Sequence, residues 1–131
     1  MSKVVELLQK SQVFHFATVD GDKPRVRPFG FVMDFEGKLY FATANSKDVY
    51  KQMKVNPNVE MSGMLENGSW IRLSGKAVLG GNAEAKRRAF EVFPRFKDIY
   101  QSPENPAFEV FYLDSPSAFV YPFTGTPEKI L

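Results

Sequence analysis

Cysteine is absent from the 131-residue sequence, and histidine and tryptophan each occur only once. Without cysteine, disulfide bonds, a thiolate nucleophile and cysteine-based metal sites are all excluded, and a reducing compartment such as the cytoplasm is the expected location. A single histidine cannot build a metal site from several imidazoles, and the carboxylates show no ligand spacing, so no metal site is expected.

Strong charge and long apolar runs are also missing. The formal net charge is only +2, which gives no basic footprint for nucleic acid. No apolar segment approaches the roughly 20 residues that span a bilayer, so no membrane partner is expected. Charged residues are mixed into residues 1–11, unlike a secretory signal. The length fits one domain over residues 1–131.

Phenylalanine is what the sequence has in abundance, with 13 copies and a total aromatic share of 15%. A phenylalanine ring has no polar group, so it must lie in a core, a subunit interface or a pocket for a planar ligand. One small core would struggle to hold all of these rings. A homodimer interface or an aromatic ligand would relieve the surplus.

Apolar periodicity and turn residues predict a mainly β protein with peripheral helices. The expected helices are an N-terminal one around residues 4–8, one capped by Ser46 and stopped at residues 56–58, and one at 83–93 capped by Asn82. Residues 101–106 are expected to be loop. The expected strands are 13–19, 25–35, 39–43, 59–65, 70–79, 108–113 and 118–121. Short antiparallel strands at this spacing favour a closed barrel.

A possible anion site combines Arg25 and Arg27 on one strand face with Ser46 and Lys47 at a helix start. A helix N-terminus offers free N–H groups and partial positive charge, and one or both arginines would add forked donors for a phosphate. The plainer interpretation is a capped helix beside solvated charges. Residue types alone favour that plainer interpretation slightly.

Phe29, Phe31, Phe41 and Trp70 are candidates for flanking a flat ring system. For most of these rings core packing is the favoured interpretation. Trp70 is the exception to watch, because it begins a strand directly after the Asn67-Gly68 hairpin turn.

His15 lies between two phenylalanines on an expected strand, so it faces away from both. It is a conceivable haem ligand or general base. A lone strand histidine is more often a structural residue, and no chemistry is assigned to it.

The order and spacing of several segments resemble the pyridoxamine 5′-phosphate oxidase-like, FMN-binding split-barrel family, and in particular its short general-stress-protein members. The resemblance reaches from the N-terminal helix to about Phe93. The segments that carry it are 24–29 (PRVRPF), 37–43 (GKLYFAT), 45–47 (NSK), 52–53 (QM), 56–59 (NPNV) and 70–77 (WIRLSGKA).

The resemblance implies a six-stranded antiparallel split β-barrel that forms a homodimer and binds two FMN molecules between its subunits. The arginine-bearing strand and the Ser46-Lys47 helix start would hold the phosphate, and residues around Trp70, where the true oxidases have glutamine, would approach the ring. The full set of cofactor-binding residues implied is Arg25, Arg27, Pro28, Phe29, Thr43, Asn45, Ser46, Lys47, Gln52 and Trp70.

The C-terminus departs from the true oxidases. Their arginine- and tryptophan-containing substrate segments have no counterpart, and Tyr121-Pro122-Phe123 ends the barrel instead. Pyridoxamine phosphate is therefore not the expected substrate. The function expected is an FMN-dependent oxidoreductase for an unidentified small molecule or electron donor, in which the flavin carries the electrons and no residue is assigned a catalytic role.

Three alternatives remain open at this point. The protein could be a non-catalytic flavin carrier or sensor, or a haem-binding relative on the same barrel with His15 as the ligand. A deazaflavin could replace FMN. Binding of single-stranded nucleic acid is disfavoured by the near-neutral charge.

Overall fold

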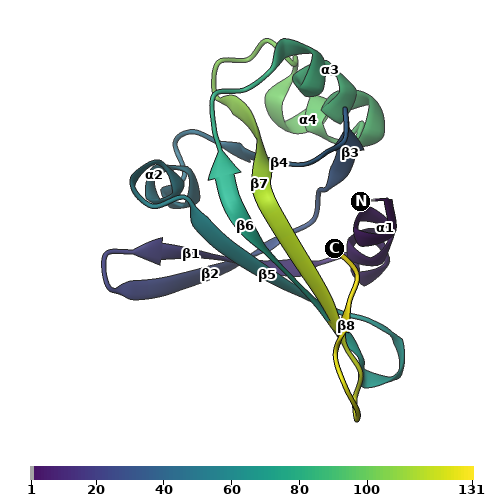
Figure 1. Ribbon diagram of the computed structural model, residues 1–131. Coiled ribbons are helices and arrows are strands. Elements are labelled where there is room, and N and C mark those ends of the chain that lie inside the picture. The colour runs from purple at the N-terminus through teal and green to yellow at the C-terminus, as the bar shows by residue number, and fades with distance from the viewer. Residues whose placement is uncertain (1) are drawn as a thin grey trace.

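One strongly curved antiparallel sheet dominates the computed structural model, which describes residues 2–131 (Figure 1). Within those residues the hydrogen-bonded strand order is β2-β1-β5-β6-β7-β4-β3, and β8 pairs with β7. The strands are β1 Phe14–Asp20, β2 Lys23–Phe29, β3 Met33–Phe35, β4 Lys38–Ala44, β5 Asn58–Met64, β6 Trp70–Val78, β7 Phe108–Tyr121 and β8 Glu128–Lys129. The chain is a mainly β split barrel; β3 and β8 are short additions to six longer strands.

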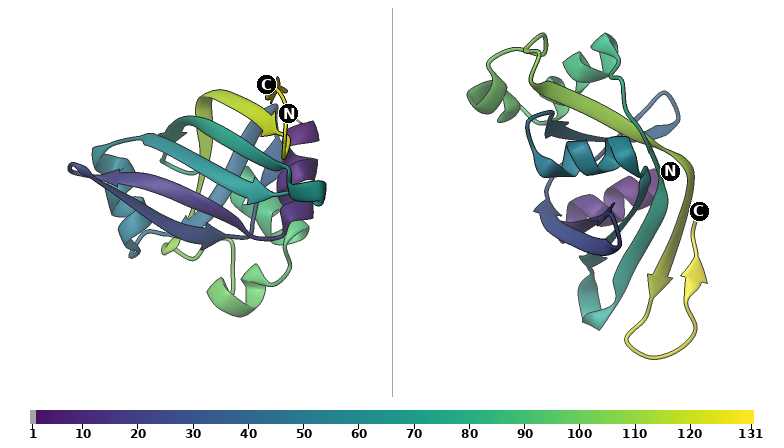
Figure 2. Two further views of the ribbon diagram at one scale, coloured as in Figure 1. Left: turned by 90° about the horizontal axis from the view of Figure 1, so that it is seen from below. Right: turned by 90° about the vertical axis from the view of Figure 1, so that its left-hand side faces the viewer.

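Helices cover the openings and one side of the sheet (Figures 1 and 2). They are α1 Ser2–Ser11, α2 Asp48–Val55, α3 Ala83–Val92 and α4 Phe96–Tyr100, with a short 3-10 turn, η1 Glu66–Gly68, in the β5–β6 hairpin. Helix α1 packs against β3 and β5, whereas α2 packs against β1 and β4. None of the helices within residues 2–131 is long and apolar enough to cross a membrane.

Successive side chains along β1 point alternately into the barrel and away from it. Phe14, Phe16 and Thr18 are buried, whereas His15 between the two rings is exposed. The β1–β2 hairpin pairs Phe14 with Phe29 and closes on a two-residue turn. Gly21 in this turn has a φ of +66°, a conformation that glycine adopts without steric cost. The hairpin predicted around residues 20–22 is therefore confirmed.

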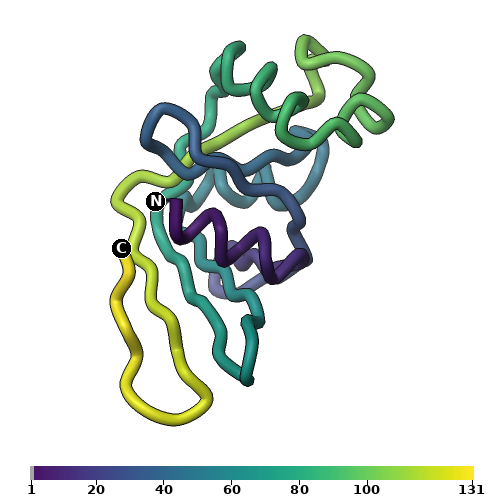
Figure 3. Tube along the Cα trace, turned by 90° about the vertical axis from the view of Figure 1, so that its right-hand side faces the viewer, coloured from purple at the N-terminus to yellow at the C-terminus, as the bar shows by residue number. Residues whose placement is uncertain are grey.

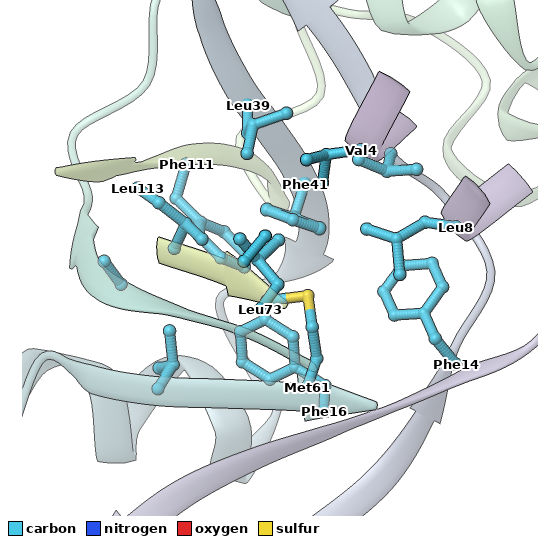
Figure 4. Close-up of a cluster of buried hydrophobic side chains, with 14 of the residues drawn as sticks. Val4, Leu8, Phe14, Phe16, Leu39, Phe41, Met61, Leu73, Phe111 and Leu113 are labelled. Carbon is cyan, nitrogen blue, oxygen red and sulfur yellow. The ribbon is translucent and has the colours of Figure 1, made fainter. Parts of the chain in front are cut away.

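The barrel core consists mainly of aromatic rings and aliphatic side chains from α1 and the inner sheet face (Figure 4). The Phe16 ring stacks on Phe29 at a centroid distance of 4.5 Å and meets Phe41 and Phe111 edge-on at 5.9 and 5.8 Å. Burying one such side chain contributes about 1.5–3 kcal/mol. Leu8 of α1 is fully buried on the same core, so the helix seals one opening.

Helices α3 and α4 lie over β3, β4 and β7 on the side away from the barrel (Figures 1 and 3). A second core lies beneath these helices. Its buried residues are Phe31, Met33, Tyr40, Ala85, Ala89, Phe96, Phe108 and Val110. The two cores together take up much of the aromatic surplus within one chain. The cap formed by α3, α4 and the loop to β7, residues 83–107, is called the α3–α4 cap below.

The strand predicted over residues 25–35 is wrong, because β2 ends at Phe29 and β3 begins at Met33. Phe31, Val32 and Met33 are all buried in succession. Phe31 and Met33 pack in the second core and Val32 packs in the barrel core, so this segment contributes to both cores while the chain leaves the β1 ladder after Phe29 and joins the β4 ladder at Met33. Segment 30–32 thereby carries the chain from one edge of the sheet to the other.

The two strands predicted at residues 108–113 and 118–121 are one continuous strand, β7. Its pairing with β6 shifts register between Ser74 and Lys76, and Ser115 has a φ of +52°. The strand accommodates Pro116 through this bulge and does not end there. A Cβ on Gly75 would lie 3.2 Å from both the Asp114 carbonyl oxygen and the Leu113 Cβ, which explains the glycine opposite the bulge.

The predicted cap of α2 is also wrong: the N-cap residue is Lys47, its side chain makes no capping bond, and Ser46 lies in the preceding turn. The cap predicted for α3 is confirmed, because the Asn82 side chain accepts hydrogen bonds from the N–H groups of Glu84 and Ala85. Helix α4 and strand β8 were not predicted.

Candidate functional site

A groove lies where the end of β2, the end of β4 and the start of α2 meet the α3–α4 cap. Its volume is about 260 Å³. Its cationic side chains come from β2 and from the residue before α2, which we call the cationic end. Most of its aromatic and aliphatic side chains come from residues 29–31 and the α3–α4 cap, which we call the apolar end. The lining residues are Arg27, Pro28, Phe29, Gly30, Phe31, Ala42, Thr43, Lys47, Val49, Phe93, Phe96, Ile99 and Tyr100.

Arg27 is held at the cationic end by two polar side chains. Its Nη1 donates to the Thr18 hydroxyl at 2.7 Å, and its Nη2 donates to the Gln52 Oε1 at 2.8 Å. The Thr18 hydroxyl in turn donates to the same Gln52 oxygen at 2.5 Å. Thr18 is only 2% exposed, so this network fixes the guanidinium from a buried anchor.

The charge of Arg27 has no anionic partner within ion-pairing distance among residues 2–131. Burial lowers the pKa of its guanidinium below the usual value, and the nearby Asp48 acts in the opposite direction. A partly buried, oriented and uncompensated guanidinium favours an incoming anion, since forked N–H donors match phosphate geometry.

Lys47 adds a second cation at the same end of the groove, immediately before α2. The lysine is exposed, and the first residue of the helix, Asp48, follows it. Thr43 of strand β4 is buried and also lines the groove. The fold thus brings Thr43 and Lys47, which are close in sequence, to the same groove as the more distant Arg27.

The remaining predicted cofactor residues are placed differently. Pro28 and Phe29 line the groove, and Gln52 reaches it through Arg27. Asn45 is bonded through its side-chain amide to the Pro106 carbonyl oxygen at 2.7 Å and to Glu109 at 2.9 Å, so it anchors the α3–α4 cap.

Arg25 and Trp70 lie outside the groove of this chain. The Arg25 Nε pairs with Asp20 at 3.0 Å on the exposed hairpin. Trp70 stacks on Tyr121 at 4.3 Å, with the Arg72 guanidinium 5.1 Å from its ring centroid. A flavin contact at Trp70 stays a prediction, and it would require a second copy of the chain.

His15 is exposed on the outer face of β1, where its registered neighbours are Pro28 and Ser62. It does not line the groove. The structural interpretation of this histidine and its haem-ligand alternative both remain predictions.

Sequence reasoning missed Thr18 and the cap residues Phe93, Ile99 and Tyr100. Thr18 shares the inner face of β1 with Phe14 and Phe16, and that alternation was the available signal. Ile99 and Tyr100 had no such signal, because α4 spans only five residues, and Phe93 lies at the C-terminal end of α3. The place of these residues over the groove depends on tertiary contacts.

A larger hollow, of about 670 Å³, lies between α1, the β5–β6 hairpin and β8. It is lined by both cationic and anionic groups, Lys3 and Lys10 against Glu66 and Glu128, all of them exposed. Solvated charges of both signs offer no preference for a charged ligand. The smaller groove at Arg27 is therefore the stronger functional candidate.

The fold is that of a small split β-barrel whose groove combines the oriented Arg27 guanidinium and Lys47 with an aromatic wall. The sequence model described as pyridoxamine 5′-phosphate oxidase matches residues 1–117. The chain belongs to this family, as its sequence pattern indicated.

Solved structures agree with this assignment. A NimC/NimA family protein from Clostridium acetobutylicum is 42% identical, with a TM-score of 0.93 over 99% of this chain and 90% of that one. General Stress Protein 26 from Bacillus anthracis is 20% identical, with a TM-score of 0.77 over 98% and 97% of the two chains. A FAD-binding protein from Mesorhizobium loti shares the fold at 16% identity, with a TM-score of 0.62 over 89% and 91%. A comparison with curated proteins found no match.

Proposed function

We propose that this protein is an FMN-dependent oxidoreductase that acts on a small molecule in a reducing compartment such as the cytoplasm, with the flavin in the Arg27 groove of a homodimer. The observation that carries the proposal is the Arg27 guanidinium, which is buried on one side, oriented by Thr18 and Gln52, and free of any ion pair among residues 2–131.

The residues of the groove fit FMN. Arg27 and Lys47 would bind its terminal phosphate, and Thr43 offers a hydroxyl in the same lining. Pro28 and Phe29 supply an apolar wall beside the cations. When bound, the flavin supplies the hydride and electron chemistry, so the chain's own residues need only bind it, orient it and restrict access by water.

The size of the groove supports a dimer. Small-molecule pockets usually measure roughly 300–1,000 Å³ and bury most of the ligand, whereas this groove measures about 260 Å³ in one chain. A second chain placed over it would supply the missing wall. In that arrangement a residue far from the groove of its own chain, such as Trp70, could reach the flavin of the partner.

The outer face of the sheet offers a surface for this second copy. Strand pairing places Val26, Ala17, Glu60 and Ser74 in one row across β2, β1, β5 and β6. Met64, Trp70 and Tyr121 form another row on the same face. Val26 and Met64 are 67% and 63% exposed. Apolar and aromatic residues on one exposed face are typical of subunit interfaces.

The first experiment is to record the visible absorption of the purified protein before and after addition of FMN or FAD, followed by gel filtration. A flavin spectrum that elutes with a dimer-sized peak is expected, with FMN retained more tightly than FAD. A colourless protein that retains neither flavin would refute the proposal. A haem-like band that disappears in His15→Ala would replace it with the haem-binding alternative.

Alanine substitutions of the two cationic residues test the site itself. Arg27→Ala and Lys47→Ala should each weaken FMN binding by about 1.5–3 kcal/mol, or roughly ten- to a hundredfold, because each removes a charge-assisted contact. Arg25→Ala is the matched control, since this arginine already pairs with Asp20. Equal FMN affinity in Arg27→Ala, Lys47→Ala and the unmodified protein would rule out the assignment.

The dimer is tested separately with matched valine variants. Val26→Arg places a charge on the proposed interface, whereas Val55→Arg places the same charge on α2, where the native side chain is 87% exposed. We expect only Val26→Arg to elute as a monomer in analytical gel filtration. A Val26→Arg protein that remains dimeric would show that the copies associate through another face.

A further inference from the structure

The Arg27 groove changes chemical character along its length. Arg27 and Lys47 stand at the cationic end, while the apolar end is formed by Phe31 and the α3–α4 cap residues Phe93, Phe96, Ile99 and Tyr100. No charged side chain lines this second end among the described residues. A phosphate held by the cations leaves the apolar end available to a different chemical group.

The apolar end is built on a rigid support. The Phe96 ring is 8% exposed and lies 5.0 Å from Phe31 and 5.2 Å from Phe108, centroid to centroid. The loop that follows α4 is tied back by the Asn105 side-chain amide, which donates to the Tyr100 carbonyl oxygen at 2.8 Å. Because Asn45 also holds the Pro106 carbonyl oxygen, the cap is fastened to β4 near the groove.

Exposure rises from the base of this end to its mouth. Phe31 and Phe96 are buried, and Phe93 and Tyr100 are partly buried. Ile99 of α4 is apolar, yet its side chain is 59% exposed. Aromatic faces with an exposed aliphatic side chain at the rim form a surface that a flat apolar molecule can cover.

The electrostatics of this end disfavour charged ligands. Burial raises the pKa of the Tyr100 phenol above its usual value, so this side chain stays neutral and keeps its proton at physiological pH. A charged group placed among Phe93, Phe96 and Ile99 would lose hydration without gaining a counter-ion. The Tyr100 ring lies 6.0 Å from the Phe96 ring, centroid to centroid, and its phenol is a hydrogen-bond donor that suits a carbonyl oxygen.

We propose that the α3–α4 cap forms the substrate end of the groove, and that it selects a flat, uncharged aromatic electron acceptor of the quinone class. This inference rests on the proposed function, because the acceptor receives its electrons from the bound flavin. A quinone that takes up two electrons and two protons becomes a hydroquinone, while reduced FMN, itself reduced by dithionite or a nicotinamide donor, returns to the oxidised form.

Binding is tested without any flavin, by titrating 1,4-naphthoquinone into the isotope-labelled protein and following backbone amide signals by NMR. The absence of cysteine removes the thiol addition that usually complicates quinone titrations. Saturable shifts centred on residues 93–100 are expected. Shifts confined to other surfaces, or no saturable shift up to the solubility limit, would overturn the proposal even if FMN binds as proposed.

Two glutamate variants then separate the substrate end from a general effect on the cap. Ile99→Glu places a charge at the mouth, and Val92→Glu places the same charge on α3 at a side chain that is 44% exposed and does not line the groove. We expect Ile99→Glu to bind naphthoquinone at least tenfold more weakly. We also expect its KM for quinone reduction by the dithionite-reduced holoprotein to be at least tenfold higher. Val92→Glu should match the unmodified protein.

The affinity for FMN distinguishes the outcomes. If Ile99→Glu weakens FMN binding as strongly as naphthoquinone binding, the apolar end holds the flavin ring and the substrate proposal is wrong. If both variants bind naphthoquinone like the unmodified protein, the cap has no role in recognition and the proposal is wrong as well. Failure of the unmodified protein to bind FMN would refute the proposed function, whereas the flavin-free titration would still decide the binding proposal.

Discussion

Gln52 is the residue at which a role in anion binding can be separated from a role in stability. Its Oε1 accepts from the Arg27 Nη2 at 2.8 Å and from the Thr18 hydroxyl at 2.5 Å. Replacement by glutamate keeps the shape of the side chain and both hydrogen bonds. The change adds one negative charge at hydrogen-bonding distance from the guanidinium.

The Gln52→Glu substitution should move stability and affinity in opposite directions. Arg27 lacks an ion pair among residues 2–131, and burial lowers the pKa of its guanidinium, so a carboxylate at position 52 supplies the counter-ion that the fold lacks. A partly exposed pair of this kind contributes about 0–1 kcal/mol to the free energy of unfolding. FMN phosphate binding should weaken by about 1.5–3 kcal/mol, or roughly ten- to a hundredfold, because the guanidinium is already neutralised.

The assay combines urea unfolding of the flavin-free protein with FMN titration by fluorescence quenching. Gln12→Glu is the matched control, since it makes the same substitution at an exposed position outside the groove lining. Gln52→Met removes the acceptor without adding charge and should lower both stability and affinity. If Gln52→Glu binds FMN as tightly as the Gln12→Glu control, the phosphate does not lie at Arg27 and the reasoning fails.

Three further predictions concern stability. Gly63→Ala should lower the free energy of unfolding by about 1–3 kcal/mol in urea titrations, because the new Cβ would lie 2.8 Å from the Ser11 Oγ; an unchanged value would mean that α1 shifts freely. Asn82→Ala should cost about 0.5–2 kcal/mol through loss of two capping hydrogen bonds, and Asn82→Asp should recover most of it in the same assay. Burial raises the pKa of the Tyr100 phenol in the folded protein. The contribution of this phenol to stability is therefore complete below its pKa in the unfolded chain, about 10, and is lost as the pH rises through its pKa in the folded protein. Tyr100→Phe should accordingly reduce the decrease in the free energy of unfolding at alkaline pH. Equal slopes above pH 10 for Tyr100→Phe and the unmodified protein would contradict the last prediction.

Local signals predicted the elements whose structure is decided locally. The Asp20-Gly21-Asp22 turn and the Asn82 cap depend on neighbouring residues, and both are present as expected. The resemblance of ordered segments to a flavin-binding family supplied the barrel, which periodicity alone only favoured. It also supplied Gln52 of α2, whose partners Thr18 and Arg27 come from strands β1 and β2.

The errors occur where distant contacts decide the local structure. Residues 30–32 connect two distant edges of the sheet and place Phe31 and Val32 in different cores, and α4 packs its Phe96 ring on the rings of Phe31 and Phe108. Ser46 was expected to cap α2, but the turn after β4 shifts the helix start by one residue, so Lys47 occupies the cap position. A sequence window contains none of these contacts.

Strands β4 and β7 have a consequence for how the molecule unfolds. On one face they carry Phe41 and Phe111 into the barrel core, and on the other they carry Tyr40 and Phe108 into the core beneath the α3–α4 cap. The two cores therefore share a wall, and neither can melt while that wall keeps its packing on both sides. Hydrogen exchange should show the amides of β4 and β7 opening only in the global transition, with both cores lost as one cooperative unit.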